Sequence, residues 1–404
     1  MTFRELLAKY KDGTLSEEEK LLVEQELEKS EAINDYLAEE IERSMLPGIA
    51  GQVDEANDQF KIEKSIKRTV YKRLAAVVAI SVACVFAIVM MIQYIISPLV
   101  SSQYYDPTRK TAGQKYKQDF FNDIRAITEV SKPGYAMTGS ANAEKLGFGK
   151  YNIIYERKNL FTKEYETIRA QLNKNKRVGD FESFYASRGN FAFTEFWNSK
   201  EGSSEYEEVL DMKNLDTETQ IAHIRELPAT SYISAWVRFT DDLTMEELCK
   251  LEYFTFKNID FKWIAVRTAN NQGQQLMGFY TGPNDSVVSG DKIDQNKYPG
   301  FELVDLMFSP IYTPYEAYMG KNYETHYTSL LKYLVDHQEA VTALVGNSKQ
   351  FDYKSALEYT ENSGISTYGA LVYGEADELL DLYESGNIMT FTIDHVIASQ
   401  YIQY

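Results

Sequence analysis

The chain holds few cysteines and histidines, with two and four of them in 404 residues. Cys84 lies in a long apolar run and Cys249 in a polar region far along the chain, so the two cannot pair and no disulfide framework is expected. The histidines are scattered, and none has the spacing of a metal site or of a Cys–His catalytic pair. We therefore expect no metal, no cofactor and no catalytic residues, and we expect hydrophobic cores to stabilise the domains.

Basic residues are also in the minority, since 42 lysines and arginines face 60 aspartates and glutamates and the net charge is −18. Residues 1–60 carry 6 basic and 16 acidic residues, whereas residues 61–73 carry 6 basic residues and one acidic residue. Direct binding of DNA or RNA requires a basic surface, and neither polar part of the chain offers one. We therefore expect no direct nucleic-acid partner, and the short basic cluster suits lipid headgroups instead.

Formal charge is absent between Arg73 and Asp106, and most of that interval is strongly apolar. The 23 residues 74–96 contain only three polar side chains. As a helix rising about 1.5 Å per residue, this run would be about 35 Å long, which is enough to cross the apolar core of a bilayer. A secretory signal peptide would stand at the extreme N-terminus, and a buried helix of a soluble protein is seldom apolar on every face. The sequence therefore predicts one transmembrane helix over residues 74–97.

The charges that flank this run are asymmetric. Six basic residues crowd residues 61–73, whereas those on the C-terminal side are fewer and further away. The positive-inside bias predicts a single-pass protein of the cell membrane with a cytoplasmic N-terminus and extracytoplasmic C-terminal domains. Tyr94, Tyr104 and Tyr105 suit the interfacial belt on the outer side.

Residues 1–53 are expected to form a small all-α module of three short helices. The first helix ends at the turn Lys11–Gly13, the second begins with a capping box at Ser16, and the third follows Ser30. A basic helix over residues 54–73 then leads to the apolar run.

Apolar residues recur at helical spacing along these helices. A module this small buries little area, so one interpretation is that a partner protein completes its core, and the other is that these side chains pack only within the module. The candidates for contact with a partner are Leu6, Tyr10, Leu22, Val23, Leu27, Tyr36, Leu37, Ile62 and Ile66.

The segment LLAKYKDGTLSEEEKLLVEQELEKSEAINDYL, residues 6–37, resembles the anti-sigma domain of membrane-bound anti-sigma factors. The shared features are a first helix that ends in Tyr and a Gly turn, followed by Leu-Ser-x-Glu-Glu and a Glu-rich helix. Many members bind zinc through a His and a Cys-x-x-Cys motif, but Glu26, Ser30 and Ile33 stand at those positions, and residues 1–73 contain no His or Cys. The resemblance thus implies a zinc-free member, in which we expect Ile33 to pack in the module core.

The stretch FKIEKSIKRTVYKR, the apolar run and the tetrapeptide YYDP together resemble the sigma factor regulator family of Firmicutes. The C-terminal half of the chain resembles the C-terminal domain of that family. This resemblance implies that the N-terminal module binds an extracytoplasmic-function (ECF) sigma factor and blocks its contacts with promoter DNA and RNA polymerase. It also implies that the outer domains sense the envelope or bind a second membrane protein.

Two extracytoplasmic domains are expected, an α+β domain over residues 105–215 and an α/β domain over residues 220–404. In the first, the helical segment QDFFNDIRAITEVS precedes an alternating strand pattern that starts near Tyr151. In the second, a strand–helix–strand pattern occurs twice, around Ala235 and around Ala370, with strand-to-helix spacings of 13 and 12 residues. Duplication and coincidence explain this similarity equally well.

Two short motifs fail as catalytic sites. GISTYG, residues 364–369, is one residue too long for a nucleophile elbow, and GFGK, residues 147–150, lacks the upstream glycine of a P-loop. The predicted fold class is a multi-domain protein with an all-α cytoplasmic module, one transmembrane helix and an α+β extracytoplasmic region. The expected function is that of a single-pass membrane anti-sigma factor that releases its ECF sigma factor on an envelope signal. The alternative is an extracytoplasmic binding or scaffold protein with a cytoplasmic docking tail, and a surface enzyme is the least supported interpretation.

Overall fold

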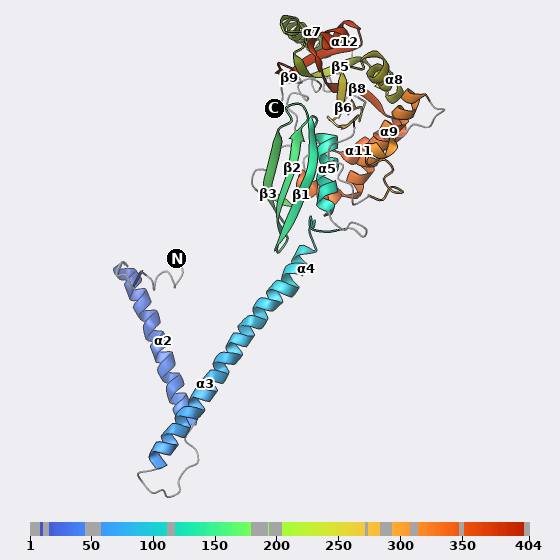
Figure 1. Ribbon diagram of the computed structural model, residues 1–404. Coiled ribbons are helices and arrows are strands. Elements are labelled where there is room, and N and C mark those ends of the chain that lie inside the picture. Colours follow the sequence, from blue (N-terminus) through green and yellow to red (C-terminus); the bar gives the residue numbers. More distant parts are fainter. Residues whose placement is uncertain are drawn as a thin grey trace. The chain divides into compact units, whose positions relative to one another are not determined.

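The structure is a computed structural model, shown in Figure 1, and it divides the chain into two compact units, Met1–Phe86 and Ala87–Tyr404. The residues that it describes are 9–10, 16–44, 58–110, 118–178, 193, 204–270, 274–282, 293–307, 314–346 and 351–399.

Helix α2 (Glu17–Ser44) is a single continuous helix of 28 residues. It begins directly after Ser16, whose carbonyl oxygen accepts a hydrogen bond from the backbone N–H of Lys20 at 2.9 Å. The predicted break at Ser30 is wrong, because no glycine or proline lies near it and a serine inside a helix costs only about 0.5 kcal/mol relative to alanine. Of the expected first helix, only Lys9 and Tyr10 lie among the described residues, and both are helical.

The apolar run forms a helix that is long and apolar enough to cross a membrane. Within the described residues, one helix meets that criterion; it covers Arg68–Ser101 over 34 residues, and its most apolar 18 consecutive residues have a mean hydropathy of 2.9 and include no buried residue. This stretch comprises most of α3 (Asp58–Met91), the π-helical turn η1 (Ile92–Ile96) and α4 (Ser97–Ser101). The wide turn precedes Pro98, which has no N–H to donate to the preceding turn, so the regular hydrogen-bond ladder is interrupted there.

The second unit begins with a four-stranded antiparallel sheet in the order β1-β2-β3-β4. Its strands are β1 (Tyr135–Gly147), β2 (Lys150–Asn159), β3 (Tyr165–Asn173) and β4 (Lys176–Val178). The predicted alternation on β2 is confirmed, because Tyr151, Ile153 and Tyr155 are buried whereas the residues between them are more exposed. The predicted helix is α5 (Asp119–Ser131), which is entirely buried and lies against β1 (Figure 1).

A five-stranded antiparallel sheet follows, in the order β7-β6-β8-β5-β9. The elements that build it are β5 (Tyr232–Thr244), α8 (Met245–Lys250), β6 (Asp260–Val266), β7 (Gly278–Tyr280), β8 (Ser366–Glu375), α12 (Ala376–Glu384) and β9 (Ile388–Ile397). The β5-α8-β6 and β8-α12-β9 units interleave, so that each inserts a strand between the two strands of the other. The repeated strand–helix–strand pattern of the sequence therefore corresponds to two equivalent halves of one sheet, and the predicted capping box between Thr244 and Glu247 is confirmed.

The remaining helices pack around the two sheets. They are α7 (Ser204–Glu226), η2 (Leu251–Thr255), η3 (Leu303–Leu306), α9 (Tyr315–Asp336), α10 (Gln338–Leu344) and α11 (Tyr353–Ser363). One hydrophobic core joins Phe120 of α5 and Tyr155 of β2 to Ile233 and Phe391 of the five-stranded sheet. The domain boundary predicted between residues 215 and 220 stays a prediction, although α7 runs across it.

A buried carboxyl group in this unit provides a test of the packing. Glu252 on η2 accepts a hydrogen bond from the hydroxyl of Tyr323 at 3.1 Å, and burial raises the pKa of Glu252 to about 8. Between about pH 4.5 and 8, the unfolded chain ionises this group while the folded chain keeps it protonated, so stability falls as the pH rises through that range. We expect Glu252→Gln to exceed the wild type in unfolding free energy by about 2–4 kcal/mol at pH 8 and to match it near pH 5.

The measurement is chemical denaturation of the full chain in detergent at a series of pH values. Glu246→Gln is the control, because Glu246 is exposed on α8 and its replacement should give no gain that grows with pH. Identical pH dependence in the wild type and in Glu252→Gln would contradict the prediction.

Candidate protein-interaction site

Helix α2 carries an exposed apolar stripe made of Ile33, Tyr36 and Leu37. Their side chains are 59%, 64% and 49% exposed. Residues at i, i+3 and i+4 lie on the same face of a helix, so the three side chains form one continuous surface. Apolar surface concentrated in this way on a charged helix is typical of a site that another protein covers.

The opposite face of α2 is acidic. Glu24, Glu28, Glu31 and Asp35 follow one another at spacings of four, three and four residues, and all four are exposed. At about 100° per residue, this acidic stripe lies roughly 160° around the helix from the apolar stripe. Such a helix can place its apolar side in the groove of a partner while its carboxylates attract a basic surface.

The candidate residues from the sequence are distributed over different environments. Leu27 is 41% exposed and joins Tyr36 and Leu37 as accessible apolar residues, whereas Val23 is fully buried. The Tyr10 side chain is half-buried, and its hydroxyl donates to Oε1 of Glu24 at 3.3 Å. Leu6 lies outside the described residues, and the same is true of the side chains of Leu22, Ile62 and Ile66.

Ile33 was missed as a candidate for partner contact. The expectation that it packs in the module core is wrong, because more than half of its side chain is exposed. Ile33 lies on the same face of α2 as Tyr36 and Leu37. Its spacing from those two residues is the signal that could have identified it.

The second unit contains a buried polar network around Asp123 of α5. The Asp123 carboxylate accepts hydrogen bonds from the hydroxyl of Tyr105 at 2.6 Å, the hydroxyl of Tyr333 at 2.8 Å and Nδ1 of His337 at 2.7 Å. Burial and the neighbouring Asp123 hold the pKa of Tyr105 well above its ordinary value, so this phenol stays a neutral donor. Since Tyr105 follows α4 closely, the network attaches the end of the apolar helix to α5 and α9.

A second buried pair, Glu129 and His326, lies nearby. Nε2 of His326 is 2.8 Å from a Glu129 carboxylate oxygen, and Nδ1 is 2.8 Å from the carbonyl oxygen of Gly300. Burial raises the pKa of Glu129, but His326 and the Arg125 guanidinium outweigh it and leave the pKa below its ordinary value. Because both members of the pair are buried, it serves the fold and is inaccessible to a substrate.

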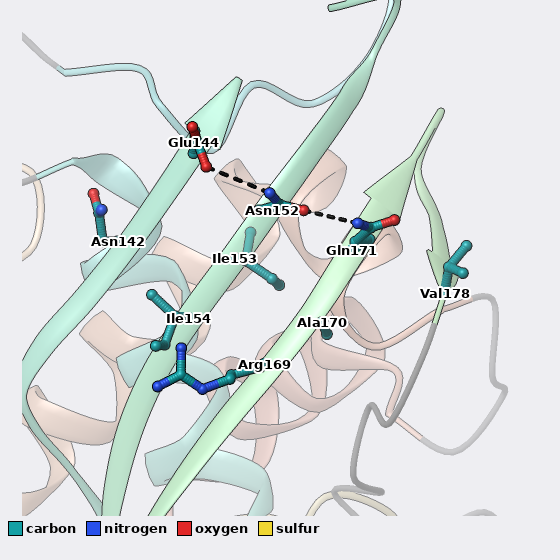
Figure 2. A pocket seen from close by; sticks show the side chains of 9 residues that line it. All are labelled: Asn142, Glu144, Asn152, Ile153, Ile154, Arg169, Ala170, Gln171 and Val178. Atoms are coloured by element: carbon teal, nitrogen blue, oxygen red, sulfur yellow. Dashed lines mark hydrogen bonds between the residues drawn. The ribbon is translucent and has the colours of Figure 1, made fainter. Parts of the chain in front are cut away.

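The exposed face of the four-stranded sheet bears a shallow hollow of about 510 Å³, drawn in Figure 2. Three cross-strand side chains form a row on this face: Asn152 donates to Glu144 at 3.4 Å, and Gln171 donates to Asn152 at 2.9 Å. Arg169 and Ile154 lie beside them (Figure 2). This face of the sheet therefore presents a row of polar side chains that bond one another across the strands.

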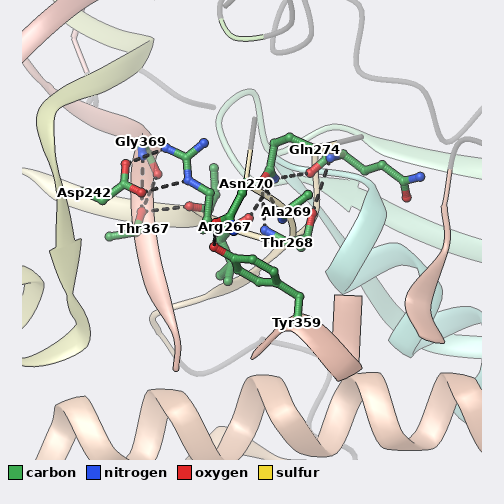
Figure 3. Close-up of polar contacts among 12 residues, drawn as sticks. Asp242, Arg267, Thr268, Ala269, Asn270, Gln274, Tyr359, Thr367 and Gly369 are labelled. Atoms are coloured by element: carbon green, nitrogen blue, oxygen red, sulfur yellow. Dashed lines mark hydrogen bonds and ion pairs between the residues drawn. The ribbon is translucent and has the colours of Figure 1, made fainter. Parts of the chain in front are cut away.

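A cluster of polar contacts at one end of the five-stranded sheet, shown in Figure 3, is fully engaged in holding strands together. Arg267 pairs with both carboxylate oxygens of Asp242, at 2.8 and 2.6 Å, next to an irregularity in β5. The Gln274 side chain accepts hydrogen bonds from the N–H groups of Thr268 and Ala269 and donates to two backbone carbonyls. This cluster therefore stabilises the sheet, and its groups are already partnered.

Metal ligation finds no support in the part of the chain that the structure describes. Among those residues, no group of three or more His, Cys, Asp or Glu side chains is placed to hold a metal ion. The candidate site that the described residues offer is the exposed apolar stripe of α2.

Comparison with known proteins adds one finding. Residues 224–395 match the family model of the sigma factor regulator C-terminal domain. No curated protein and no solved structure matches the chain significantly. The matched segment runs from the end of α7 into β9 and contains the interleaved strand–helix–strand units, which confirms the predicted resemblance of the C-terminal half. The match supports a role in sigma factor regulation.

Proposed function

We propose that this chain is a single-pass membrane anti-sigma factor. In this proposal, the N-terminal unit binds an ECF sigma factor in the cytoplasm, and the C-terminal unit lies on the other side of the membrane and responds to the state of the envelope. The observation that carries the proposal is the family match over residues 224–395 in a chain that also has an exposed apolar stripe before a membrane-length helix.

The two faces of α2 supply the proposed binding. Ile33, Tyr36 and Leu37 lose contact with water when a partner covers them, and this desolvation provides affinity. The acidic stripe favours approach of a basic surface, such as the faces through which a sigma factor contacts promoter DNA. Sigma bound in this way would be kept from promoter DNA and polymerase. The proposed role is non-catalytic and uses no metal.

Chain topology follows from the charges beside the helix. The basic cluster in residues 61–73 favours retention of the N-terminal unit in the cytoplasm, and the uncharged interval that ends at Asp106 favours a single crossing. A second membrane protein is a candidate partner for the C-terminal unit, whose four-stranded sheet offers an open polar face.

Deletion of residues 1–60 tests the proposal in the native cell. We expect the deletion to switch on transcription from the promoters of one sigma factor, because the truncated protein keeps its membrane helix but has lost α2. RNA sequencing measures the response. Affinity purification of the full chain from solubilised membranes should recover that sigma factor in near-stoichiometric amount, and the truncated chain should not recover it.

The alternative, an extracytoplasmic scaffold, predicts a different result. Under that interpretation, the deletion leaves transcription unchanged, no sigma factor co-purifies with the full chain, and the function of the C-terminal unit persists. That combination of outcomes would overturn the proposed function.

A further inference from the structure

The tip of the β1–β2 hairpin is fixed to the end of the apolar helix. The hydroxyl oxygen of Ser97 accepts a hydrogen bond from the backbone N–H of Phe148 at 3.0 Å, and that of Ser101 accepts one from Gly149 at 3.0 Å. Both serines are buried, although the helix that carries them is otherwise exposed there. Figure 1 shows α4 meeting this end of the four-stranded sheet. The hairpin tip and the last turns of the helix thus form one structural element.

Backbone geometry at the tip allows this close approach. Gly147 has φ +90° and Gly149 has φ +71°, and a Cβ atom at either position would lie 2.7 Å from a side-chain atom of Ser97 or Tyr104, respectively. Phe148, between them, also adopts a positive φ of 54°, which is unfavourable for a bulky residue, and its side chain is 39% exposed. The tip therefore holds an aromatic side chain at the surface in a conformation that has an energetic cost.

Apolar and basic side chains gather around this tip. Leu99 of α4 is 64% exposed, on the side of that turn opposite Ser97 and Ser101, and Leu146 of β1, two residues before Phe148, is 47% exposed. The β3–β4 turn lies against the hairpin, because the backbone N–H of Lys174 donates to the carbonyl oxygen of Gly149 at 2.8 Å. The exposed lysines on these turns are Lys150, Lys174 and Lys176. We refer to Leu99, Leu146, Phe148 and these three lysines as the tip patch.

We propose that the tip patch inserts into the interfacial layer of the membrane, with its apolar side chains among the lipid headgroups and its lysines on anionic phospholipids. This inference rests on the membrane crossing in the proposed function, and it does not depend on sigma binding. If residues 74–96 span the apolar core, the next turn, Ser97–Ser101, lies at headgroup level. The tip patch is hydrogen-bonded to that turn and must lie at the same depth.

The composition of the tip patch fits a lipid surface. Aromatic and aliphatic side chains surrounded by lysines are typical of segments that lie in the membrane interface. The apolar groups enter the boundary of the acyl chains there, and the ammonium groups bind the lipid phosphates. Such anchoring would fix the four-stranded sheet relative to the membrane plane and would turn its opposite end away from the bilayer.

Lipid quenching of site-specific labels on the full chain in nanodiscs tests the proposal. The nanodiscs contain phosphatidylglycerol, phosphatidylcholine and a lipid that bears a quencher near its headgroup. The label is bimane on Phe148→Cys. The same chain carries Cys84→Ser, because Cys84 is exposed and would also react, whereas Cys249 is buried and can stay. The control is Tyr165→Cys, an exposed position on β3. Tyr165 pairs with Lys158, eight residues along the strands from the Lys150–Asn173 pair next to the tip, which corresponds to a distance of about 27 Å from that pair. We expect quenching at position 148 to be at least about three-fold greater than at position 165.

A second variant, Leu146→Cys, gives an independent reading of the same patch and should be quenched like position 148. Replacing Lys150 and Lys174 by glutamate should reduce the quenching at position 148 in anionic discs to the level in discs of phosphatidylcholine alone. Equal quenching at positions 146, 148 and 165 would overturn the inference.

The native Cys84, labelled in the unaltered chain with quenchers placed along the acyl chains, separates failure of this inference from failure of the proposed topology. If Cys84 is quenched but the tip positions behave like position 165, the crossing stands and the tip patch does not contact lipid. If Cys84 is not quenched, the crossing is wrong and the inference falls with it.

Discussion

Replacing Ile33 and Leu37 with aspartate should weaken binding of the sigma factor by at least about 100-fold, because each substitution puts a carboxylate into a surface that must lose its water on binding. Both residues lie on the exposed apolar stripe of α2, and neither is buried in the free protein. The substitutions should therefore leave the helix and its unit folded. Affinity measured between the full chain in detergent and the sigma factor that co-purifies with the wild type gives the fold-change.

Ala38→Asp is the matched control for this double substitution. Ala38 is an exposed apolar residue next to Leu37 in sequence, but it is about 100° further around the helix and about 150° from the centre of the apolar stripe, so it lies nearer the acidic stripe. The same chemical change there should alter the affinity by no more than a few-fold. Equal losses of affinity in the two variants would show that added negative charge weakens binding, and not the loss of the apolar stripe. Unchanged affinity in the Ile33 and Leu37 double variant would show that the apolar stripe is not part of the interface.

The second large effect is expected from Asp123→Ala. The Asp123 carboxylate is buried and accepts hydrogen bonds from Tyr105, Tyr333 and His337. Truncation leaves three polar groups without their acceptor in a space too closed for them to regain water easily. We expect a loss of about 3–5 kcal/mol in the unfolding free energy of the second unit, measured by chemical denaturation of the full chain in detergent.

Asp352→Ala provides the comparison, since Asp352 is an exposed aspartate that caps α11 through the backbone N–H of Ser355. Loss of a helix cap typically costs about 1 kcal/mol. Hydrogen exchange supplies a second readout: in Asp123→Ala, residues 102–110 should exchange faster because Tyr105 is released, whereas Asp352→Ala should leave them protected. If both variants lose similar stability and similar protection, Asp123 does not have the role assigned to it.

Local patterns in the sequence predicted much of the fold. The alternation of Tyr151, Ile153 and Tyr155 predicted β2, and the capping box at Thr244 predicted the start of α8, because both signals depend on neighbouring residues. The break at Ser30 was predicted from a weak signal, since serine is tolerated inside a helix. The expectation that Ile33 packs in a core came from its position in the anti-sigma resemblance, and the structure leaves that side chain exposed.

Contacts between distant residues had no such signal. The hydrogen bonds from Phe148 and Gly149 to Ser97 and Ser101 join residues about fifty positions apart, and serines in an apolar helix normally satisfy their hydroxyls on the preceding turn. The partners of Asp123 are also distant in sequence: Tyr105 is 18 residues away, and Tyr333 and His337, both at the end of α9, are more than 200 residues away. The apolar stripe of α2, in contrast, is readable from the sequence, because residues 33, 36 and 37 share one helix face whether or not the helix is broken at Ser30.

The order of strands in the five-stranded sheet has a consequence for how the protein is made. Among the described strands, β5 pairs with β8 and β9 alone, and β6 meets β5 only through β8, which follows β6 by about a hundred residues. During synthesis, β5 and β6 therefore remain without their main pairing partners until the last forty residues have emerged, and contacts this distant in sequence close slowly. The N-terminal unit is complete long before that moment. If the N-terminal unit binds a sigma factor as proposed, a newly made chain can hold it before the C-terminal unit has folded, so repression would be established first and responsiveness acquired afterwards.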